Sequence, residues 1–431
     1  MGGPRDAEIT IVGGGALGCA VAYFLARAGR RDVVLLEKDE LASGTTSQAA
    51  GLVGQVRASA ARVRIAMFSV RTFVELARAP GCDPDYRAVG SFRLALTPER
   101  EAEFRHLVAV GRREGLEVDF VSLQEVAQRV PLLDLSRVRA AIWCPSDGYV
   151  QPYGLTTAYA QEARALGVRI HTGTRALGLV ARRGAITGVL TDQGEIRTDT
   201  VVVAAGPWAG MLAATAGVEL PIVPVRHQYF VTEPVAGVSP DLPVLRIPDR
   251  RLYVRAEVHG LLVGGFEANP ASVDPRTLPR DYRGLAVEPD WERLSGFGED
   301  AQPLLPAVAD ARIIASFRGL PTFTPDGRFC LGRVPGVRGL IMAAGCCAHG
   351  VSGSAGLGMT VAAALLGEEP LVDLGPVQAA RFGPAPIDWS AARQAAERAY
   401  AEYYSLQPEL AVAPSARPAA DVPAGPAPRE S

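Results

Sequence analysis

The first forty residues contain a strand–turn–helix pattern that constrains the fold more than any other part of the chain. An apolar strand runs into the turn Gly13-x-Gly15-x-x-Gly18, a helical pattern follows from Ala16 to Arg27, and Glu37 closes the next apolar run. In such a unit the three glycines permit a tight turn, close approach to a pyrophosphate and close helix–strand packing. The helix N-terminus binds the pyrophosphate, and the acidic residue accepts hydrogen bonds from a ribose. The pattern predicts an α/β fold that binds a dinucleotide.

Composition and charge exclude several classes of protein. The chain has 431 residues, enough for two domains, and its 48% hydrophobic and 21% charged residues are typical of a globular protein. A net charge of -2 and the lack of a long apolar run argue against nucleic-acid and membrane partners. Lys38 is the only lysine, which argues against Schiff-base chemistry. Because six cysteines lack metal-site spacing and no targeting segment is recognised, we expect a cytoplasmic protein without a metal site.

Periodicity and turn residues divide the chain into short elements. Helical patterns occupy residues 49–78, 98–114, 155–166, 291–297 and 349–366. Strand patterns occupy residues 91–96, 168–171, 178–181, 186–190, 195–198, 200–208, 226–232 and 252–255. Residues 407–431 are rich in alanine and proline without apolar periodicity, and we expect this segment to be disordered.

Segments typical of a nucleotide-binding fold occur at the start, in the middle and near the end of the chain. The middle segment is the buried strand Val201-Val-Val-Ala-Ala-Gly206, and the last contains the Gly345 turn and the helix entry at His349-Gly350. Strand-rich segments lie between them. We therefore expect an α/β architecture with two interleaved domains, each built from discontinuous pieces.

Five longer sequences follow one another in the order of a known family and cover most of residues 7–370. They are Ser43-Gly-Thr-Thr-Ser-Gln-Ala-Ala-Gly-Leu-Val53, Arg226-His-Gln-Tyr229, Gly264-Gly-Phe-Glu-Ala-Asn-Pro270, Thr324-Pro-Asp-Gly327 and Ala343-Ala-Gly-Cys-Cys-Ala-His-Gly350. With them the chain resembles the D-amino-acid-oxidase superfamily, and within it the flavin half of sarcosine and dimethylglycine dehydrogenases and oxidases. The resemblance implies that the dinucleotide is FAD.

The resemblance also implies how the chain is divided. It predicts a Rossmann-like FAD-binding domain over residues 7–85, 143–215 and 310–370. A strand-rich α+β substrate-binding domain is expected over residues 86–142 and 216–309. Residues 371–406 resemble the connector helices that precede a folate-binding aminomethyltransferase domain in many dimethylglycine-type relatives.

Two departures from the family concern the attachment of the flavin. Several relatives carry Trp-His where this chain has Ser47-Gln48, and that histidine forms their covalent flavin bond. Monomeric sarcosine oxidases instead use a cysteine at the place of Gly319. Neither Gln48 nor Gly319 can form such a bond, so the resemblance implies non-covalent FAD.

The dinucleotide pattern and the resemblance together predict a set of FAD-contacting residues. They are Gly13, Gly15, Ala16, Leu17, Gly18, Glu37, Lys38, Ser43, Thr45, Thr46, Gln48, Ala50, Gly51, Leu52, Ala205, Gly206, Trp208, Gly319, Gly345, His349, Gly350 and Val351. Among them, His349 and Gly350 lie at a helix start, where backbone N–H groups stabilise negative charge on a reduced flavin.

The resemblance implies oxidation of an amine, by transfer of a hydride to flavin N5, to an iminium that then hydrolyses. This chemistry needs a neutral amine, so a nearby group has to accept its proton or hold its lone pair. His227 lies where dimethylglycine-type relatives place an active-site histidine, and Tyr253 matches a tyrosine that faces their substrate. We therefore expect His227 and Tyr253 to be the catalytic residues.

The anionic end of the substrate and the electron acceptor are less constrained. Pro321 stands where glycine-oxidase-like relatives have a carboxylate-binding arginine, and Arg255 and Arg318 are the candidates to replace it. Leu262 stands where monomeric sarcosine oxidases have an oxygen-activating lysine, which favours a dehydrogenase or a slow oxidase. The acceptor is therefore either O2 or an electron-transfer protein.

The leading hypothesis is FAD-dependent oxidation of a secondary or tertiary amine, an N-methyl or cyclic amino acid such as sarcosine, dimethylglycine or a proline derivative. One alternative is a tailoring amine oxidase of a biosynthetic pathway, which acts on a larger substrate. Another is a non-catalytic regulatory flavoprotein. That branch of the superfamily would lose the polar residues on the substrate side, whereas His227 and Tyr253 are present.

Overall fold

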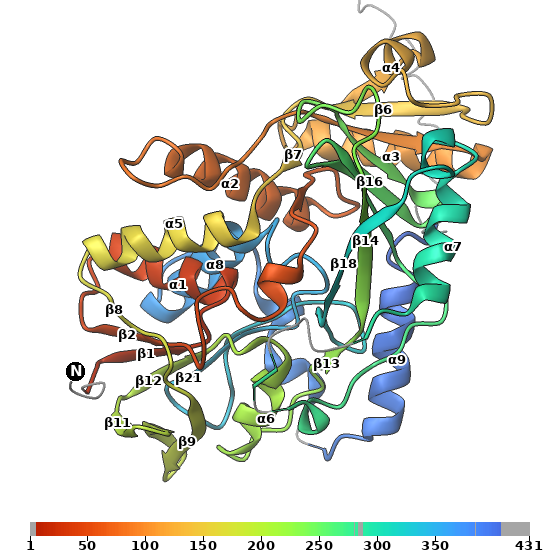
Figure 1. Cartoon of the computed structure of the whole chain (residues 1–431). Coiled ribbons are helices and arrows are strands. Elements are labelled where there is room, and N and C mark those ends of the chain that lie inside the picture. Colours follow the sequence, from red (N-terminus) through yellow and green to blue (C-terminus); the bar gives the residue numbers. More distant parts are fainter. Residues whose placement is uncertain (1–5, 280, 283–287, 384, 407–431) are drawn as a thin grey trace, which may run out of the picture.

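A mostly parallel sheet and a mostly antiparallel sheet lie side by side in the computed structural model, which describes residues 6–279, 281–282, 288–383 and 385–406 (Figure 1). The first sheet has six strands in the order β20-β21-β12-β1-β2-β8. They are β1 (Ile9–Val12), β2 (Val33–Leu36), β8 (Arg169–His171), β12 (Thr200–Val203), β20 (Cys330–Arg333) and β21 (Leu340–Ala344). The mixed α/β fold expected from the sequence is confirmed, and the domain boundaries stay a prediction.

The second sheet has eight strands in the order β18-β14-β17-β16-β15-β4-β6-β5. They are β4 (Ser91–Ala95), β5 (Asp119–Val121), β6 (Ala140–Cys144), β14 (His227–Thr232), β15 (Val244–Ile247), β16 (Leu252–Glu257), β17 (Gly260–Gly265) and β18 (Ile313–Gly319). Three smaller sheets are separate from these two. One has three strands, β9 (Ala176–Arg182), β10 (Ala185–Thr191) and β11 (Gly194–Arg197). The other two are pairs: β3 (Leu52–Val53) with β7 (Gly148–Tyr149), and β13 (Val223–Pro224) with β19 (Thr322–Phe323).

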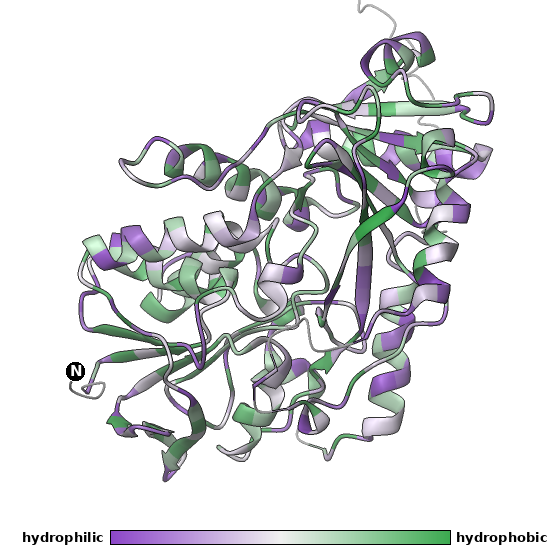
Figure 2. Cartoon of the chain, in the orientation of Figure 1, coloured by the Kyte–Doolittle hydropathy of each residue, from purple (hydrophilic) through white to green (hydrophobic). Residues whose placement is uncertain are grey.

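Helices cover the six-stranded sheet on one face and the eight-stranded sheet on its outer face (Figure 1). They are α1 (Ala16–Arg27), α2 (Ala60–Leu76), α3 (Pro98–Arg113), α4 (Leu123–Arg129), α5 (Pro152–Ala165), α6 (Ala209–Ala214), α7 (Trp291–Ala301), α8 (Ser354–Leu366) and α9 (Trp389–Ala401). Figure 2 shows α8 largely in hydrophobic colours, whereas α9 alternates between hydrophilic and hydrophobic residues. Among the described residues, no helix is both long and apolar enough to cross a membrane.

The strand register of the eight-stranded sheet places a row of residues on one face. Arg93 pairs with Arg246, Arg246 with Tyr253, Tyr253 with Gly264, and Gly264 with Tyr229. Residues directly opposite one another in a sheet point to the same side, so these side chains share a face. Their neighbours along each strand, such as Leu245 and Val254, point the other way into the apolar core beneath α7. The sheet thus carries charged and hydroxyl groups on its inner face.

Two predicted helices were wrong at their starts. Residues 49–59 are extended rather than helical, and α2 begins only after Ser59, whose hydroxyl accepts a hydrogen bond from the Arg62 amide. Gly51 has φ +68°, a conformation that favours glycine. A Cβ there would lie 2.2 Å from the Val150 oxygen, so the backbone at Gly51 packs directly against that of Val150. The helix expected from residue 349 begins at Ser354. The predicted disordered tail, 407–431, lies outside the described residues.

The contact between α1 and α8 depends on a glycine. A Cβ built on Gly358 of α8 would lie 2.8 Å from the Ala20 Cβ and 2.9 Å from the Ala20 carbonyl carbon of α1. Both helices belong to the core above the six-stranded sheet. Any side chain at position 358 would force the two helices apart.

We therefore predict that Gly358→Ala lowers the free energy of unfolding by about 1–3 kcal/mol, the usual cost of overpacking. Gly296 of α7 is a matched control, because a Cβ there meets no atom within 4 Å. Gly296→Ala is expected to leave stability unchanged or raise it by up to about 1 kcal/mol. Thermal and urea unfolding measure both changes. Equal effects of the two substitutions would contradict this description of the α1–α8 contact.

Candidate active site: two joined cavities

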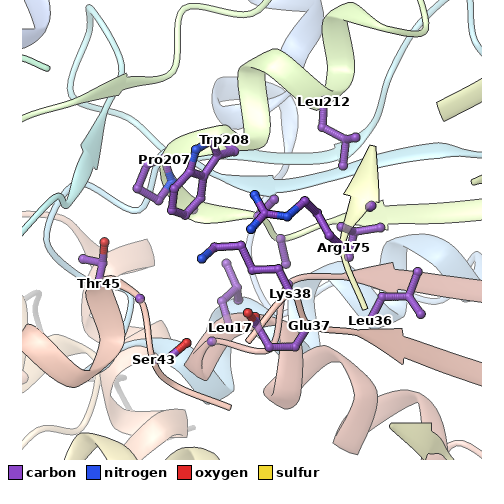
Figure 3. A pocket seen from close by; sticks show the side chains of 18 of the residues that line it. Leu17, Leu36, Glu37, Lys38, Ser43, Thr45, Arg175, Pro207, Trp208 and Leu212 are labelled. Atoms are coloured by element: carbon purple, nitrogen blue, oxygen red, sulfur yellow. The ribbon is translucent and has the colours of Figure 1, made fainter. Parts of the chain in front are cut away.

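The first cavity lies at the carboxyl ends of β1, β2 and β12, where open α/β sheets bind their ligands. Its lining includes most of the residues predicted for the nucleotide half of the cofactor: Gly13, Gly15, Ala16, Leu17, Glu37, Lys38, Ser43, Thr45, Thr46, Ala205, Gly206 and Trp208. Figure 3 shows Lys38 and Trp208 directed into this space together with Arg175, which the sequence did not single out. The Lys38 ammonium lies 5.1 Å from the centre of the Trp208 ring.

The glycine turn exposes backbone atoms, without side chains, to the first cavity. Gly13 has φ +116°, and a Cβ there would lie 2.3 Å from the Ala204 oxygen. A Cβ on Gly18 would lie 1.9 Å from the Gly13 oxygen, so α1 lies directly on the end of β1. Gly15 caps α1 without a side-chain hydrogen bond. The N-terminus of the helix therefore meets the cavity through backbone groups, which suits a pyrophosphate.

Glu37 is held in place at the tip of β2 by two backbone amides. Its carboxylate accepts hydrogen bonds from the Gly14 amide at 2.7 Å and the Asp39 amide at 3.0 Å. Burial raises the pKa of Glu37, and the two amide hydrogen bonds oppose that rise. Each carboxylate oxygen still has a lone pair for a hydroxyl donor, as a ribose diol requires.

The second cavity continues from the first, since Thr45, Thr46 and Gly206 line both. Other predicted residues in its lining are Gln48, Ala50, Gly51, Leu52, His227, Tyr253, Gly319, Gly350 and Val351. Three predicted cofactor residues, Gly18, Gly345 and His349, line neither cavity. The second cavity thus brings the predicted catalytic pair together with the loops predicted to hold the flavin ring.

His227 connects two tyrosine hydroxyls. Its Nε2 lies 2.7 Å from Tyr253 Oη, and its Nδ1 lies 2.7 Å from Tyr400 Oη. Burial lowers the pKa of His227 to about 4, so the ring is neutral at pH 7. A neutral imidazole has one donor and one acceptor nitrogen, so it donates to one tyrosine and accepts from the other. Both ring nitrogens are therefore occupied, and Tyr253 Oη is the polar atom that this group presents to a ligand.

His349 has a different environment. Its Nδ1 donates a hydrogen bond to the Cys347 carbonyl at 2.6 Å, and its buried Nε2 has no hydrogen-bond partner among the described residues. Burial, with the charges of Arg57, Arg62 and Arg246, holds the pKa of His349 well below its usual value. The ring is therefore neutral, and His349 does not line the second cavity, whereas its neighbours Ala348 and Gly350 do.

The second cavity is also lined by residues that the sequence analysis did not predict for the site, among them Arg57, Arg246, Phe266 and Tyr403. The two arginines are more than nine-tenths buried. Tyr403 follows α9 and stacks on Phe266 with 3.9 Å between ring centres. A charged residue inside an apolar strand, as in Val244-Leu-Arg-Ile247, was the available signal for Arg246.

Arg255, one of the two predicted carboxylate ligands, has other partners. Its Nε donates to the Ala50 carbonyl at 2.7 Å, and its Nη2 pairs with the Glu257 carboxylate at 2.5 Å. The side chain also lies over the Tyr149 ring. Neither Arg255 nor Arg318, the other candidate, lines the second cavity.

A helix N-terminus that meets a cavity beside a carboxylate, joined to a second cavity with a His–Tyr pair, is an arrangement that suits a dinucleotide-dependent redox protein. The family model described as FAD dependent oxidoreductase matches residues 8–364, so the chain belongs to this family. FAD is accordingly its cofactor, and the glycine cradle and the two joined cavities fit that group.

Several characterised proteins are similar to this chain. It is 32% identical over 385 residues to 4-methylaminobutanoate oxidase (formaldehyde-forming) of Paenarthrobacter nicotinovorans and 34% identical to mitochondrial dimethylglycine dehydrogenase of Rattus norvegicus. These matches cover 88% of this chain but only 46% and 45% of the relatives, so the chain spans about half their length. The crystal structure of L-proline dehydrogenase from P. horikoshii matches with a TM-score of 0.79 and 28% identity, over 88% of this chain and 98% of that one.

The residues near the expected flavin ring bear on its attachment. A Cβ on Gly319 would lie 3.1 Å from the Gln48 Cβ, so the two positions adjoin, and neither carries a nucleophile. Cys346 also lines the second cavity, and burial raises the pKa of its thiol to about 12, so it is protonated and unreactive at pH 7.

We predict that acid or heat denaturation releases all of the FAD and leaves a colourless polypeptide. Flavin absorbance of the precipitate and of the supernatant measures this directly. Yellow colour that stays with the protein would contradict non-covalent binding. In that case Cys346→Ser would test whether the cavity thiol forms the bond.

Proposed function

We propose that this chain oxidises a secondary or tertiary amine, an N-methyl or cyclic amino acid such as sarcosine, dimethylglycine or a proline derivative, with FAD as its cofactor. The observation that carries the proposal is the second cavity. It places the hydrogen-bonded His227–Tyr253 pair and two buried arginines beside the loops of Gln48, Gly319 and Gly350. The names of the similar proteins, which act on methylated amines and proline, support the same chemistry.

Tyr253 and His227 have different roles in this proposal. Tyr253 Oη contacts the amine nitrogen or its proton, because it is the hydroxyl of the pair that faces the cavity. His227 is a positioning residue, since its two nitrogens hold Tyr253 on one side and Tyr400 on the other. Gly264 makes room for this arrangement: a Cβ there would lie 2.4 Å from Tyr253 Oη.

The protein's own contribution to the reaction is orientation, proton handling and exclusion of water. FAD, when bound, takes up the two electrons and the hydrogen that leave the substrate carbon next to nitrogen. The amine enters in its neutral form, Tyr253 donates a hydrogen bond from its hydroxyl to the amine lone pair, and His227 fixes the direction of that hydroxyl. Tyr403 and Phe266 line the cavity with stacked rings and so supply part of its apolar wall. The resulting iminium hydrolyses to a carbonyl group and an amine, which separate when the substrate is an N-methyl amine and stay in one ring-opened molecule when it is cyclic.

The two alternatives from the sequence make different demands on the site. A tailoring oxidase would need room for a larger substrate beside the same groups. A regulatory flavoprotein would not need a polar cavity, and the joint presence of Tyr253, Arg57 and Arg246 argues against it. Leu262, which is buried in β17, supports a dehydrogenase over a fast oxidase, with O2 and an electron-transfer protein as the two candidate acceptors.

Anaerobic reduction of the purified flavoprotein tests the proposed function. The panel contains sarcosine, dimethylglycine, proline, hydroxyproline and D-amino acids, and loss of flavin absorbance reports oxidation. We predict bleaching by at least one N-methyl or cyclic amino acid. If no member bleaches the flavin while dithionite does, the proposal fails and the tailoring or regulatory reading gains support.

Substitutions separate the roles within the cavity. Tyr253→Phe is expected to slow flavin reduction about 100-fold with FAD content unchanged, because it removes the hydroxyl that hydrogen-bonds to the amine nitrogen. His227→Ala should slow reduction as well without expelling FAD. Tyr229→Phe is the control, since the Tyr229 hydroxyl lies on the same sheet face but reaches only the Ala49 carbonyl, at 3.4 Å. Stopped-flow reduction measures the rates. Equal rates for Tyr253→Phe and Tyr229→Phe would contradict the assigned role.

A further inference from the structure

Three arginines from separate segments meet in the interior beside the second cavity. Arg57 follows β3, Arg93 lies on β4 and Arg246 lies on β15, with 8%, 8% and 4% of their surfaces exposed. Arg93 and Arg246 are direct neighbours across the sheet. Burial lowers the pKa of Arg93 to about 10, so this guanidinium keeps its charge at pH 7. The interior of the protein thus holds three positive charges in one cluster, which we call the arginine cluster.

The arginine cluster has few hydrogen-bond partners, and all of them are neutral. Arg57 Nη1 and Arg93 Nη2 donate to the same carbonyl, that of Val56, at 3.1 and 2.6 Å. Arg246 Nη1 donates to Tyr404 Oη at 3.0 Å. The Nε atoms of all three arginines are buried without a partner, and within the described chain none of the three forms an ion pair. Burying a guanidinium without a counter-charge lowers the stability of the folded protein. An anion bound beside the cluster would offset this penalty.

One carboxylate of the protein acts on the cluster through space. The charge of Asp147 reaches all three arginines, but its own oxygens accept hydrogen bonds from the Gln55 amide and the Ser91 hydroxyl. Glu103 and Asp249 are ion-paired with Arg100, whose Nη2 donates to the Tyr404 carbonyl. The three positive guanidinium charges and the negative charge of Asp147 give the arginine cluster and its surroundings a net charge of about +2.

The position of the arginine cluster indicates which molecule supplies the missing anion. Arg57 and Arg246 line the second cavity, and Arg246 is the cross-strand neighbour of Tyr253. The guanidinium of Arg246 lies against the bare backbone of Gly54, where a Cβ would be 2.9 Å from Nη2. The isoalloxazine of oxidised FAD is neutral and supplies no counter-charge to the arginine cluster. The substrate is therefore the molecule in this cavity that can supply the anion. Transfer of a hydride from an uncharged amine group to the flavin leaves one positive charge on the substrate nitrogen and adds one negative charge to the flavin, so the total charge of the site is unchanged by the reaction.

We propose that the substrate is an amine with two anionic groups, a dicarboxylate such as an N-alkyl aminodicarboxylic acid, and that Arg57 and Arg246 bind these groups with Arg93 behind them. This inference rests on the proposed amine oxidation and adds the substrate class. Guanidinium groups bind carboxylates through two parallel hydrogen bonds, and the guanidinium groups of Arg57 and Arg246, which line the second cavity, can supply donors of this kind.

Matched substrates test the charge requirement in the FAD-loaded enzyme. N-methylglutamate and N-methylglutamine have nearly the same shape and differ by one negative charge. We expect the dissociation constant from anaerobic flavin reduction to be about 10–100-fold lower for N-methylglutamate, as for the loss of a hydrogen bond to a charged group. Sarcosine, with a single carboxylate, should resemble N-methylglutamine. Equal constants for the dicarboxylate and its amide would overturn the proposal.

Binding without turnover gives an independent readout. Succinate and succinamate cannot be oxidised as amines and differ by the same charge. We expect succinate, and not succinamate, to raise the melting temperature and perturb the flavin absorbance. If no amine reduces the flavin but succinate binds selectively, the proposed function fails and the anion site stands. If amines reduce the flavin without regard to the second charge, the proposed function stands and the dianion site fails.

Variants locate the site. Arg246→Gln and Arg57→Gln should each weaken N-methylglutamate about tenfold or more and N-methylglutamine less, which flattens the preference. Arg255→Gln is the matched control, because this buried arginine is ion-paired with Glu257 and does not line the cavity. If Arg246→Gln does not fold, Arg246→Lys keeps the charge and should lose only part of the preference. An unchanged preference in both Arg57→Gln and an Arg246 variant would overturn the assignment.

Discussion

The close approach of α1 to the end of β1 is the constraint on which both cavities depend. Gly18 lies on the Gly13 carbonyl, and neither position has space for a Cβ. This contact fixes the N-terminus of α1, and the neighbouring Gly14 amide then holds the Glu37 carboxylate. The Ala16 amide in turn donates to the Thr46 hydroxyl at 3.2 Å. Thr46 lines both cavities and residues 48–52 line the second one, so the geometry of the glycine turn extends to the second cavity.

The second cavity combines a neutral histidine with concentrated positive charge. His227 is neutral because burial disfavours its protonated form, and its hydrogen bonds go to hydroxyls rather than to a carboxylate. Arg57 and Arg246 keep their charge in the same cavity. A site of this kind favours an anionic molecule whose nitrogen is uncharged, which is the form of an amino acid that amine oxidation requires. The electrostatics therefore agree with the proposed chemistry on two separate counts.

Local signals in the sequence predict much of the fold and the nucleotide half of the site. The Gly13–Gly18 turn, Glu37 and the strand of Val201 carry their own pattern of glycines and apolar runs, and their places depend on short-range geometry. The extended segment around Gly54 was instead predicted as a helix, because the spacing of its apolar residues suits a helix. Its actual course depends on the close approach of Gly51 to Val150, a contact between residues far apart in the sequence. Arg57 was consequently included in a predicted helix, whereas it lies in the extended segment and is buried.

The other missed residues come from strand register and from the end of the chain. Arg93 and Arg246 lie far apart in sequence and become neighbours only because β4 pairs with β15, a pairing that no local pattern specifies. Tyr400, Tyr403 and Tyr404 lie on or just after α9, which packs against β13 and β19 beside the eight-stranded sheet (Figure 1).

The family match ends at residue 364, yet Tyr400 binds His227, Tyr403 lines the cavity and Tyr404 binds Arg246. Residues that act directly on the proposed catalytic and anion-binding groups therefore lie outside the shared domain. This segment contacts the polar groups of the second cavity without taking part in the dinucleotide cradle, so its sequence bears on the substrate side of the site and not on the cofactor side.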